Sequence, residues 1–152
     1  MPQKAKICVI SDSHGRDMYV QTLVMDTTYT HIFFLGDGVR DFSDIYDDRI
    51  TLIEGNCDYF SDSPLQTEIN VLGKKIMLTH GHLFNVKYGL FSLISEGRKQ
   101  NADIICFGHT HRQFAKMEGD ILVLNPGSLA TGRYAEINID EKGIITYLLK
   151  DL

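Results

Sequence analysis

The sequence predicts an α/β fold in which a mixed β-sheet system carries helices on its outside. Two observations support this prediction. Short apolar runs alternate with helix-like stretches through the first part of the chain, whereas the last third contains apolar runs separated only by turns. Parallel strands need long crossover connections, and antiparallel strands can be joined by tight turns. We therefore expect a sheet system that is parallel in its first half and antiparallel in its second.

The expected elements follow one another in this order. Strands in the first part cover Lys6–Ser11, His31–Leu35, Thr51–Glu54, Gln66–Val71, Lys75–Thr79 and Asp103–Phe107. Helical patterns lie between some of them, near Asp17–Asp26, Val39–Asp47 and Tyr88–Asn101. The last third is expected to form antiparallel hairpins from Gln113–Met117, Ile121–Leu124, Tyr134–Ile139 and Ile144–Leu149.

Length and composition indicate one folded domain that spans residues 1–152. A chain of 152 residues lies within the usual domain size of about 100 to 200 residues. Hydrophobic residues at 43% and charged residues at 23% are ordinary for a soluble protein. No Pro/Ser/Gly-rich linker divides the chain.

Charge and cysteine usage exclude several classes of function. A formal charge of -5 and a pI near 5.6 argue against nucleic acid as a partner. The first apolar run, Ile7–Ile10, is shorter than the roughly 7 to 15 residues of a signal-peptide core. No run approaches the ~18 apolar residues of a membrane span. The cysteines Cys8, Cys57 and Cys106 are scattered, which argues against disulfides and favours the cytoplasm.

Polar residues follow the carboxyl ends of five expected strands. The segments are Ser11-Asp12-Ser13-His14-Gly15, Gly36-Asp37-Gly38, Gly55-Asn56-Cys57-Asp58, Thr79-His80-Gly81-His82 and Gly108-His109-Thr110-His111. They contain five of the six histidines; His31 precedes its strand and is expected to be structural. Ligand sites in α/β sheets form outside the carboxyl ends of strands. We therefore expect these five segments to meet at one rim.

The residue types at this rim indicate a metal site. Residues two apart in an extended segment point to the same side, so Asp12 with His14, and His109 with His111, can aim together. Imidazole suits Mn, Fe, Ni or Zn, and the carboxylates of Asp12 and Asp37 add oxygen donors. Alone, Asp12 could equally cap the following helix. The combination favours a transition-metal site.

In this order, the five segments resemble the signature of the calcineurin-like metallophosphoesterase superfamily, D-x-H, G-D, G-N-x-[D/E], H and G-H-x-H. Among its members, the chain is most similar to small bacterial and archaeal phosphodiesterases, which commonly share the loop Asn125-Pro126-Gly127-Ser128. The resemblance implies a four-layer fold with two packed mixed β-sheets flanked by helices. It also implies two metal positions with this ligand set: Asp12, His14 and His111 for one ion, Asn56, His80 and His109 for the other, and Asp37 bridging both.

The implied function is a binuclear-metal-dependent phosphoesterase. Two divalent ions, two carboxylates and a hydroxide leave a net positive formal charge, which attracts a phosphate. We therefore expect small phosphodiesters to be hydrolysed by attack of a metal-bound hydroxide. The expected cofactors are two divalent transition-metal ions, Mn first, with Ni, Fe or Zn as alternatives. The expected partner is a small phosphoester, with no membrane, and the resemblance allows a homo-oligomer.

Four further residues near the rim have open roles. His82 either contacts the phosphate or donates a proton, or it orients its own loop. Cys57 stands where many relatives carry a general-acid His, and a thiol is a poorer hydrogen-bond donor than a histidinium. Asp58 is expected in a turn or supporting role. Ser128 either touches a phosphate or belongs to a tight turn.

Three rival interpretations deserve comparison with metal-dependent hydrolysis. Cys106 and Arg112 match the C-x5-R spacing of cysteine-dependent phosphatases, but Cys106 lies inside a strand run. A scaffold without catalysis, like the metallophosphoesterase-like subunit of retromer, would lack metal ligands, whereas all seven implied positions are filled here. A nuclease of this superfamily would carry extra domains. The acidic residues Asp41, Asp44, Asp47 and Asp48 are expected to form a solvated face.

Overall fold

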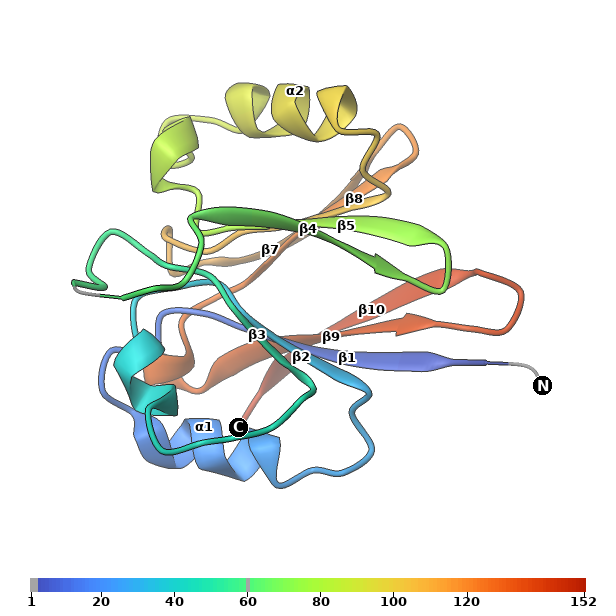
Figure 1. Ribbon diagram of the computed structural model, residues 1–152. Helices are drawn as coiled ribbons and strands as arrows, with labels where there is room; N and C mark the ends of the chain where they lie inside the picture. The colour runs from blue at the N-terminus through green and yellow to red at the C-terminus, as the bar shows by residue number, and fades with distance from the viewer. Residues whose placement is uncertain (1–2, 60) are drawn as a thin grey trace.

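Two five-stranded sheets packed face to face form the centre of the molecule (Figure 1). The computed structural model describes residues 3–59 and 61–152. The first sheet has the order β10 (Ile145–Asp151), β9 (Arg133–Ile139), β1 (Ala5–Ile10), β2 (His31–Phe34), β3 (Ile50–Leu52). The second has the order β4 (Gln66–Val71), β5 (Lys74–Thr79), β6 (Ile104–Cys106), β8 (Ile121–Pro126), β7 (Gln113–Glu118).

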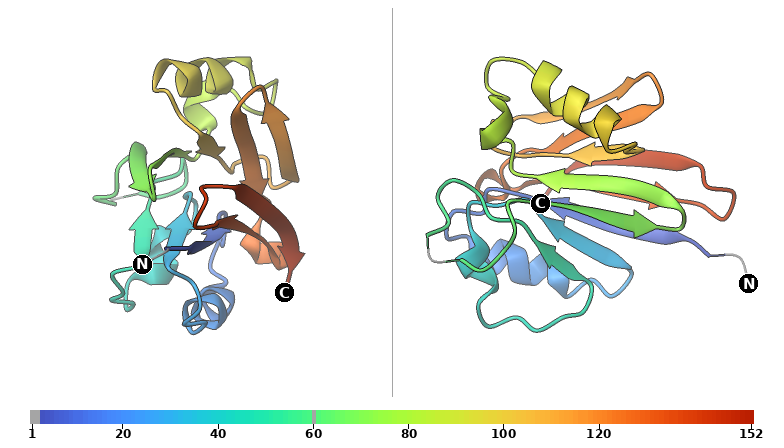
Figure 2. Two further views of the ribbon diagram at one scale, coloured as in Figure 1. Left: turned by 90° about the vertical axis from the view of Figure 1, so that its right-hand side faces the viewer. Right: turned by 45° about the horizontal axis from the view of Figure 1, so that its top comes forward.

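Helices cover the outer face of each sheet, which makes four layers and confirms the expected fold (Figures 1 and 2). Helix α1 (Asp17–Val24) lies against the first sheet and α2 (Phe91–Lys99) against the second. Three short 3-10 helices complete the elements: η1 (Val39–Phe42), η2 (His82–Phe84) and η3 (Leu129–Thr131). No helix within residues 3–59 and 61–152 is long and apolar enough to cross a membrane.

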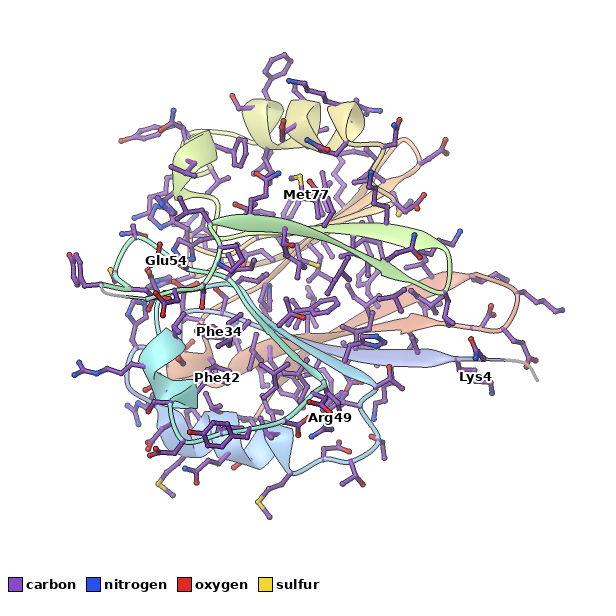
Figure 3. All side chains as sticks on the ribbon, in the orientation of Figure 1. Lys4, Phe34, Phe42, Arg49, Glu54 and Met77 are labelled. Atoms are coloured by element: carbon purple, nitrogen blue, oxygen red, sulfur yellow. The ribbon has the colours of Figure 1, made fainter. Side chains whose placement is uncertain are left out.

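The core lies mainly between the sheets, because alternate strand residues point to opposite faces. Ile7 and Val9 of β1 face the second sheet, where they pack in one cluster with Leu78 of β5. On the other face, Phe34 belongs to the cluster that α1 covers, and its ring centroid lies 4.7 Å from that of Phe42 (Figure 3). Central strands are therefore buried on both faces, which explains their continuous apolar runs.

Two strand pairings differ from the prediction. Strands β4 and β5 pair antiparallel in the first half of the chain, because only Leu72 and Gly73 connect them, with φ of 51° and 83°. Such a connection makes a tight hairpin and is too short for a crossover. Strand β8 lies parallel to β6 in the second half, and the last four strands divide between the sheets. The hairpins β7–β8 and β9–β10 are antiparallel as predicted.

The prediction of a helix near Val39–Asp47 is also wrong, since only the 3-10 helix η1 forms there. Polar side chains that bond to nearby backbone compete with helix formation. Here the Asp47 carboxylate accepts the backbone N–H of Arg49 at 3.0 Å. Of the residues in η1, only Phe42 is buried, so little apolar surface would stabilise a longer helix.

Candidate metal centre

Backbone hydrogen bonds join the loop after β1 to the loop after β2, and the loop after β5 to the loop after β6. Asp12 N–H donates to the Gly36 carbonyl at 2.9 Å, and Gly108 N–H donates to the His80 carbonyl at 2.9 Å. The loops after β1, β2, β3 and β5 lie together on the left of Figure 1. The expected rim is therefore present, at the carboxyl ends of the parallel strands.

A first group of donor atoms is formed by Asp12, His14 and His111, which lie within 4.8 Å of one another. Asp12 Oδ1 is 3.1 Å from His111 Nε2 and 3.4 Å from His14 Nε2. This carboxylate oxygen is buried and has no hydrogen-bond partner among the residues that the structure describes. A buried oxygen without a partner is costly, which makes Oδ1 a candidate ligand for a cation.

A second group, formed by Asp37, His80 and His109, lies beside the first. His80 Nε2 is 3.2 Å from Asp37 Oδ2 and 3.2 Å from His109 Nδ1. Asp37 Oδ2 is also 4.0 Å from His14 Nε2, so this carboxylate faces both groups. Asn56 lies on the loop after β3 with an exposed side chain, 3.6 Å from Cys57 Sγ, and its role as a ligand stays a prediction.

A backbone carbonyl orients His80, and the neighbouring carboxylates raise its pKa. Its Nδ1 donates to the Leu35 carbonyl at 2.7 Å, which turns Nε2 toward Asp37. Burial opposes the charged form of His80, but the bond to Asp37 and the charge of Asp12 outweigh it and raise the pKa. Burial likewise opposes charge on Asp37, but the bond and charge interaction with His80 lower its pKa. In the metal-free protein these interactions favour a proton on Nε2, the atom that faces Asp37.

This proton makes metal affinity depend on pH. We expect affinity for Mn²⁺ to rise with pH through the raised pKa of His80, because the proton is bound below that pKa and must leave before the ring can bind an ion. Calorimetric titrations with MnCl2 at about pH 6, 7 and 8, in buffers of different ionisation enthalpy, measure both affinity and released protons. Affinity and proton release that stay constant over this range would contradict the expectation.

Backbone strain is concentrated at the two groups. Five non-glycine residues here have left-handed φ values, 54° for Asp12, 43° for His14, 61° for Asp37, 72° for His109 and 63° for His111. Such values are uncommon outside glycine and cluster at functional sites. The expectation that these segments are extended is therefore wrong. Asp12 and His14 still meet in one group, whereas His109 and His111 enter different groups.

The Asp58 carboxylate supports two of these loops at once. Its Oδ2 accepts the backbone N–H of Asp37 at 2.7 Å and of Gly55 at 2.8 Å. Its Oδ1 accepts the N–H of Gly38 at 2.8 Å and of Val39 at 3.0 Å. The loop after β2 is thus tied to the loop after β3. This bonding is the supporting role expected for Asp58.

Asp41 binds the residues on both sides of His14, a contact that the sequence did not predict. Its Oδ2 accepts the Ser13 hydroxyl and the Gly15 N–H, the latter at 2.9 Å. The expected solvated acidic face is therefore wrong for Asp41. No local sequence signal could reveal the contact, because Asp41 and Ser13 lie on loops from different strands.

Glycine is required where the loops come closest. A Cβ atom at Gly108 would lie 2.1 Å from Ser11 Oγ and 2.7 Å from Asp12 Oδ2. One at Gly55 would lie 2.2 Å from Asp37 Oδ1. Both separations are far below van der Waals contact, so any larger residue would displace a carboxylate of the site.

The structure places His82 at the site and Ser128 below it. The His82 ring centroid is 5.4 Å from that of His80 and 6.2 Å from that of His109. Its Nδ1 is buried and has no partner within the described part of the chain, and both of its predicted roles remain predictions. Ser128 is buried, and its hydroxyl donates to the Asp12 carbonyl at 2.8 Å. This contact favours the turn over a phosphate contact.

Neither cysteine near the rim is activated as a nucleophile. Cys57 is exposed, and its pKa is raised by partial burial and by the negative charge of Asp37, so the thiol stays protonated at neutral pH. Cys106 is fully buried in β6, and burial raises its pKa as well. The cysteine of the C-x5-R spacing is therefore not a reactive thiolate.

Comparison with known proteins gives the family. A family model described as the calcineurin-like phosphoesterase superfamily domain matches residues 5–142. The chain belongs to this superfamily. Calcineurin-like phosphoesterases are hydrolases that bind divalent metal ions, in agreement with the two groups of donor atoms.

Individual members of the calcineurin-like superfamily are similar over much of the chain. It is 30% identical over 129 residues to the probable metallophosphoesterase YsnB of Bacillus subtilis, covering 84% of this chain and 76% of YsnB. It is 32% identical over 90 residues to the phosphodiesterase YfcE of Escherichia coli K12, covering 54% of this chain and 45% of YfcE.

Another relative and a solved structure widen the comparison. Vacuolar protein sorting-associated protein 29 of Schizosaccharomyces pombe is 35% identical over 106 residues, covering 68% of this chain and 56% of that protein. The crystal structure of a conserved protein from Streptococcus pneumoniae, described as a predicted phosphoesterase, aligns with a TM-score of 0.78 at 26% identity and covers 97% of this chain and 99% of that one.

Proposed function

We propose that this chain is a binuclear-metal-dependent phosphoesterase that hydrolyses small phosphodiesters. The observation that carries the proposal is the buried, unpartnered Oδ1 of Asp12, toward which the Nε2 atoms of His14 and His111 converge. A second group adjoins it through Asp37. The phosphodiesterase name of YfcE supports the diester preference.

The donor atoms fit two transition-metal ions. Bonds of about 2.1 Å to nitrogen or oxygen put neighbouring donors roughly 3 Å apart, and the separations in the first group are 3.1 to 3.4 Å. We propose that one ion is held by Asp12, His14 and His111, the other by Asn56, His80 and His109, and that Asp37 contacts both. Imidazole and carboxylate donors suit Mn²⁺, our first choice, and also Ni²⁺, Fe²⁺ or Zn²⁺.

The residues of the chain prepare the site for a phosphate anion. Two bound ions would supply an activated water and positive charge for the developing phosphorane. Asp12 and Asp37 neutralise only part of that charge, so the rim attracts the substrate. His82, whose ring adjoins those of His80 and His109, is the residue we propose for contact with the phosphate or for proton donation. Cys57 is a neutral thiol and a weak donor, which favours substrates with good leaving groups.

Metal removal tests the proposal directly. EDTA is expected to reduce hydrolysis of bis(p-nitrophenyl) phosphate by at least about a hundredfold, because water is then no longer activated. Mn²⁺ or Ni²⁺ should restore the rate, and metal analysis should find two ions per chain. Activity that survives EDTA but is lost after treatment with iodoacetamide would overturn the proposal and favour a cysteine mechanism.

The substitution Cys57→His tests the weak proton donor. An imidazolium here would supply both a proton and a positive charge, so activity toward p-nitrophenyl phosphate, a monoester, is expected to rise by about tenfold or more. The ratio of monoester to diester kcat/KM measures the effect, and Cys57→Ser is the matched control. An unchanged ratio in the histidine variant would mean that position 57 takes no part in the reaction.

A second candidate function is an interaction module with little catalysis. The similarity to vacuolar protein sorting-associated protein 29 of Schizosaccharomyces pombe favours it. The two groups of three donor residues favour catalysis instead. If neither diesters nor monoesters are hydrolysed with Mn²⁺, Ni²⁺, Fe²⁺ or Zn²⁺, the interaction module becomes the better conclusion.

A further inference from the structure

A pocket of about 490 Å³ is lined in part by Thr110 and Arg112, which flank His111 in the loop after β6. Thr110, which lines it, stands between His109 and His111, and its hydroxyl accepts the Asn125 side-chain amide at 3.0 Å. Two wall residues also pack on the glycine that separates His80 from His82: a Cβ atom at Gly81 would lie 3.0 Å from Val86 Cγ2 and 3.6 Å from Phe107 Cδ2. The pocket lining therefore adjoins the two segments, 80–82 and 109–111, that carry the histidines of the proposed site.

The walls of this pocket are apolar on one part and positively charged on another. Val86, Leu90, Phe107 and Phe114 form the apolar part, and the rings of Phe107 and Phe114 lie edge to face with centroids 6.4 Å apart. Buried aromatic and aliphatic walls of this kind bind planar or apolar groups. A volume of about 490 Å³ lies within the usual range of small-molecule sites.

Lys87 and Arg112 line the same pocket and supply its charge. Both side chains are exposed, and neither forms an ion pair with any residue in the described ranges 3–59 and 61–152. The pocket lining contains no acidic residue, although the whole chain carries a formal charge of -5. Two unpaired cations above apolar walls are complementary to an organic anion.

We propose that this pocket binds one ester group of the substrate, and that this group combines a planar apolar part with a second negative charge. The inference rests on the proposed function, because the phosphorus must sit at the neighbouring metal groups. The half-buried ring of Phe114, backed by the buried ring of Phe107, would take the planar part. Lys87 and Arg112 would bind the second charge, whether it is a carboxylate or a phosphate.

Phosphonates, whose C–P bond is not hydrolysed, test the pocket separately from catalysis. We would compare methylphosphonate, phenylphosphonate and 4-carboxyphenylphosphonate by calorimetry on the Mn²⁺-loaded protein. The phenyl group is expected to strengthen binding by about tenfold, through apolar burial, and the carboxylate by roughly another tenfold, through charge-assisted bonds.

Substitutions in the pocket test which residues produce the gain in affinity from the phenyl group and which produce the gain from the carboxylate. Lys87→Gln and Arg112→Gln should remove the gain from the carboxylate, and Phe114→Ala should remove the gain from the phenyl ring. All three should leave the binding of methylphosphonate unchanged. Arg98→Gln, an exposed substitution on α2 outside the pocket, is the matched control and should change none of the three affinities.

Two outcomes would overturn the inference: equal binding of all three phosphonates by the unaltered protein, or variants that weaken methylphosphonate as much as the larger probes. Failure of the proposed function has a different signature. In that case bis(p-nitrophenyl) phosphate is not hydrolysed in a metal-dependent way, whatever the order of phosphonate affinities.

Discussion

Replacing Asp37 by asparagine is expected to reduce phosphodiester hydrolysis by roughly a thousandfold or more. Asp37 Oδ2 lies 3.2 Å from His80 Nε2 and 4.0 Å from His14 Nε2, and it is the carboxylate that we propose as a bridge between the groups. Asparagine keeps the shape, and its oxygen can still accept the Cys57 N–H that Oδ1 accepts at 2.8 Å. The lost negative charge should therefore lower metal content and kcat/KM without unfolding the loop.

Metal analysis, kcat/KM and thermal unfolding of the same Asp37→Asn preparation separate these effects. Asp48→Asn removes the same charge from an exposed position away from both groups and should leave all three measurements unchanged. An Asp37→Asn protein that retains two ions per chain and most of its activity would contradict a bridging role for this carboxylate.

The second large effect is expected from Asp58→Ala, which removes the acceptor of four backbone N–H groups, those of Asp37, Gly38, Val39 and Gly55. Hydrogen bonds to a charged group contribute about 1.5 to 3 kcal/mol each, although such contributions are not additive. We expect a loss of about 3 kcal/mol in the free energy of unfolding, which lowers Tm by roughly 6 to 12 °C in a chain of this size. Activity should fall as well, since Asp37 loses its support.

Urea unfolding and the rate of hydrolysis measure this effect. Asp62→Ala, an exposed substitution a few residues further along the same loop, is the matched control and should be close to neutral. Asp58→Asn keeps one acceptor oxygen, so its free energy of unfolding should lie between those of Asp58→Ala and Asp62→Ala. A neutral Asp58→Ala would mean that water replaces the carboxylate at the four N–H groups.

Much of the fold could be predicted because the local pattern and the packing agree. The run Ile104–Cys106 is apolar throughout. One face of this strand packs in the cluster between the two sheets, and the other packs in the cluster that α2 covers. Glycines and histidines directly after such runs marked the strand ends. The rule that ligand sites form outside the carboxyl ends of strands then predicted one rim, and the family match confirms the resemblance to the superfamily.

Other features could not be predicted from the local sequence pattern. The parallel pairing of β8 with β6 depends on a partner about twenty residues away, and a hairpin pattern is equally consistent with a separate antiparallel sheet. The support of His14 by Asp41 joins loops from two strands. Neither contact produces a periodic pattern in the sequence, because both depend on how the strands are ordered in space.

The sequence by itself determined the residue types at each strand end, the family, and the glycines that let the loops approach. Only the tertiary structure decided how these side chains reach their groups, since left-handed backbone at His109 and His111 sends neighbouring rings to different groups. That conformation is intrinsically unfavourable for residues other than glycine. It persists because contacts from other strands hold it, among them the bond from His109 N–H to Asp12 Oδ2 at 3.1 Å.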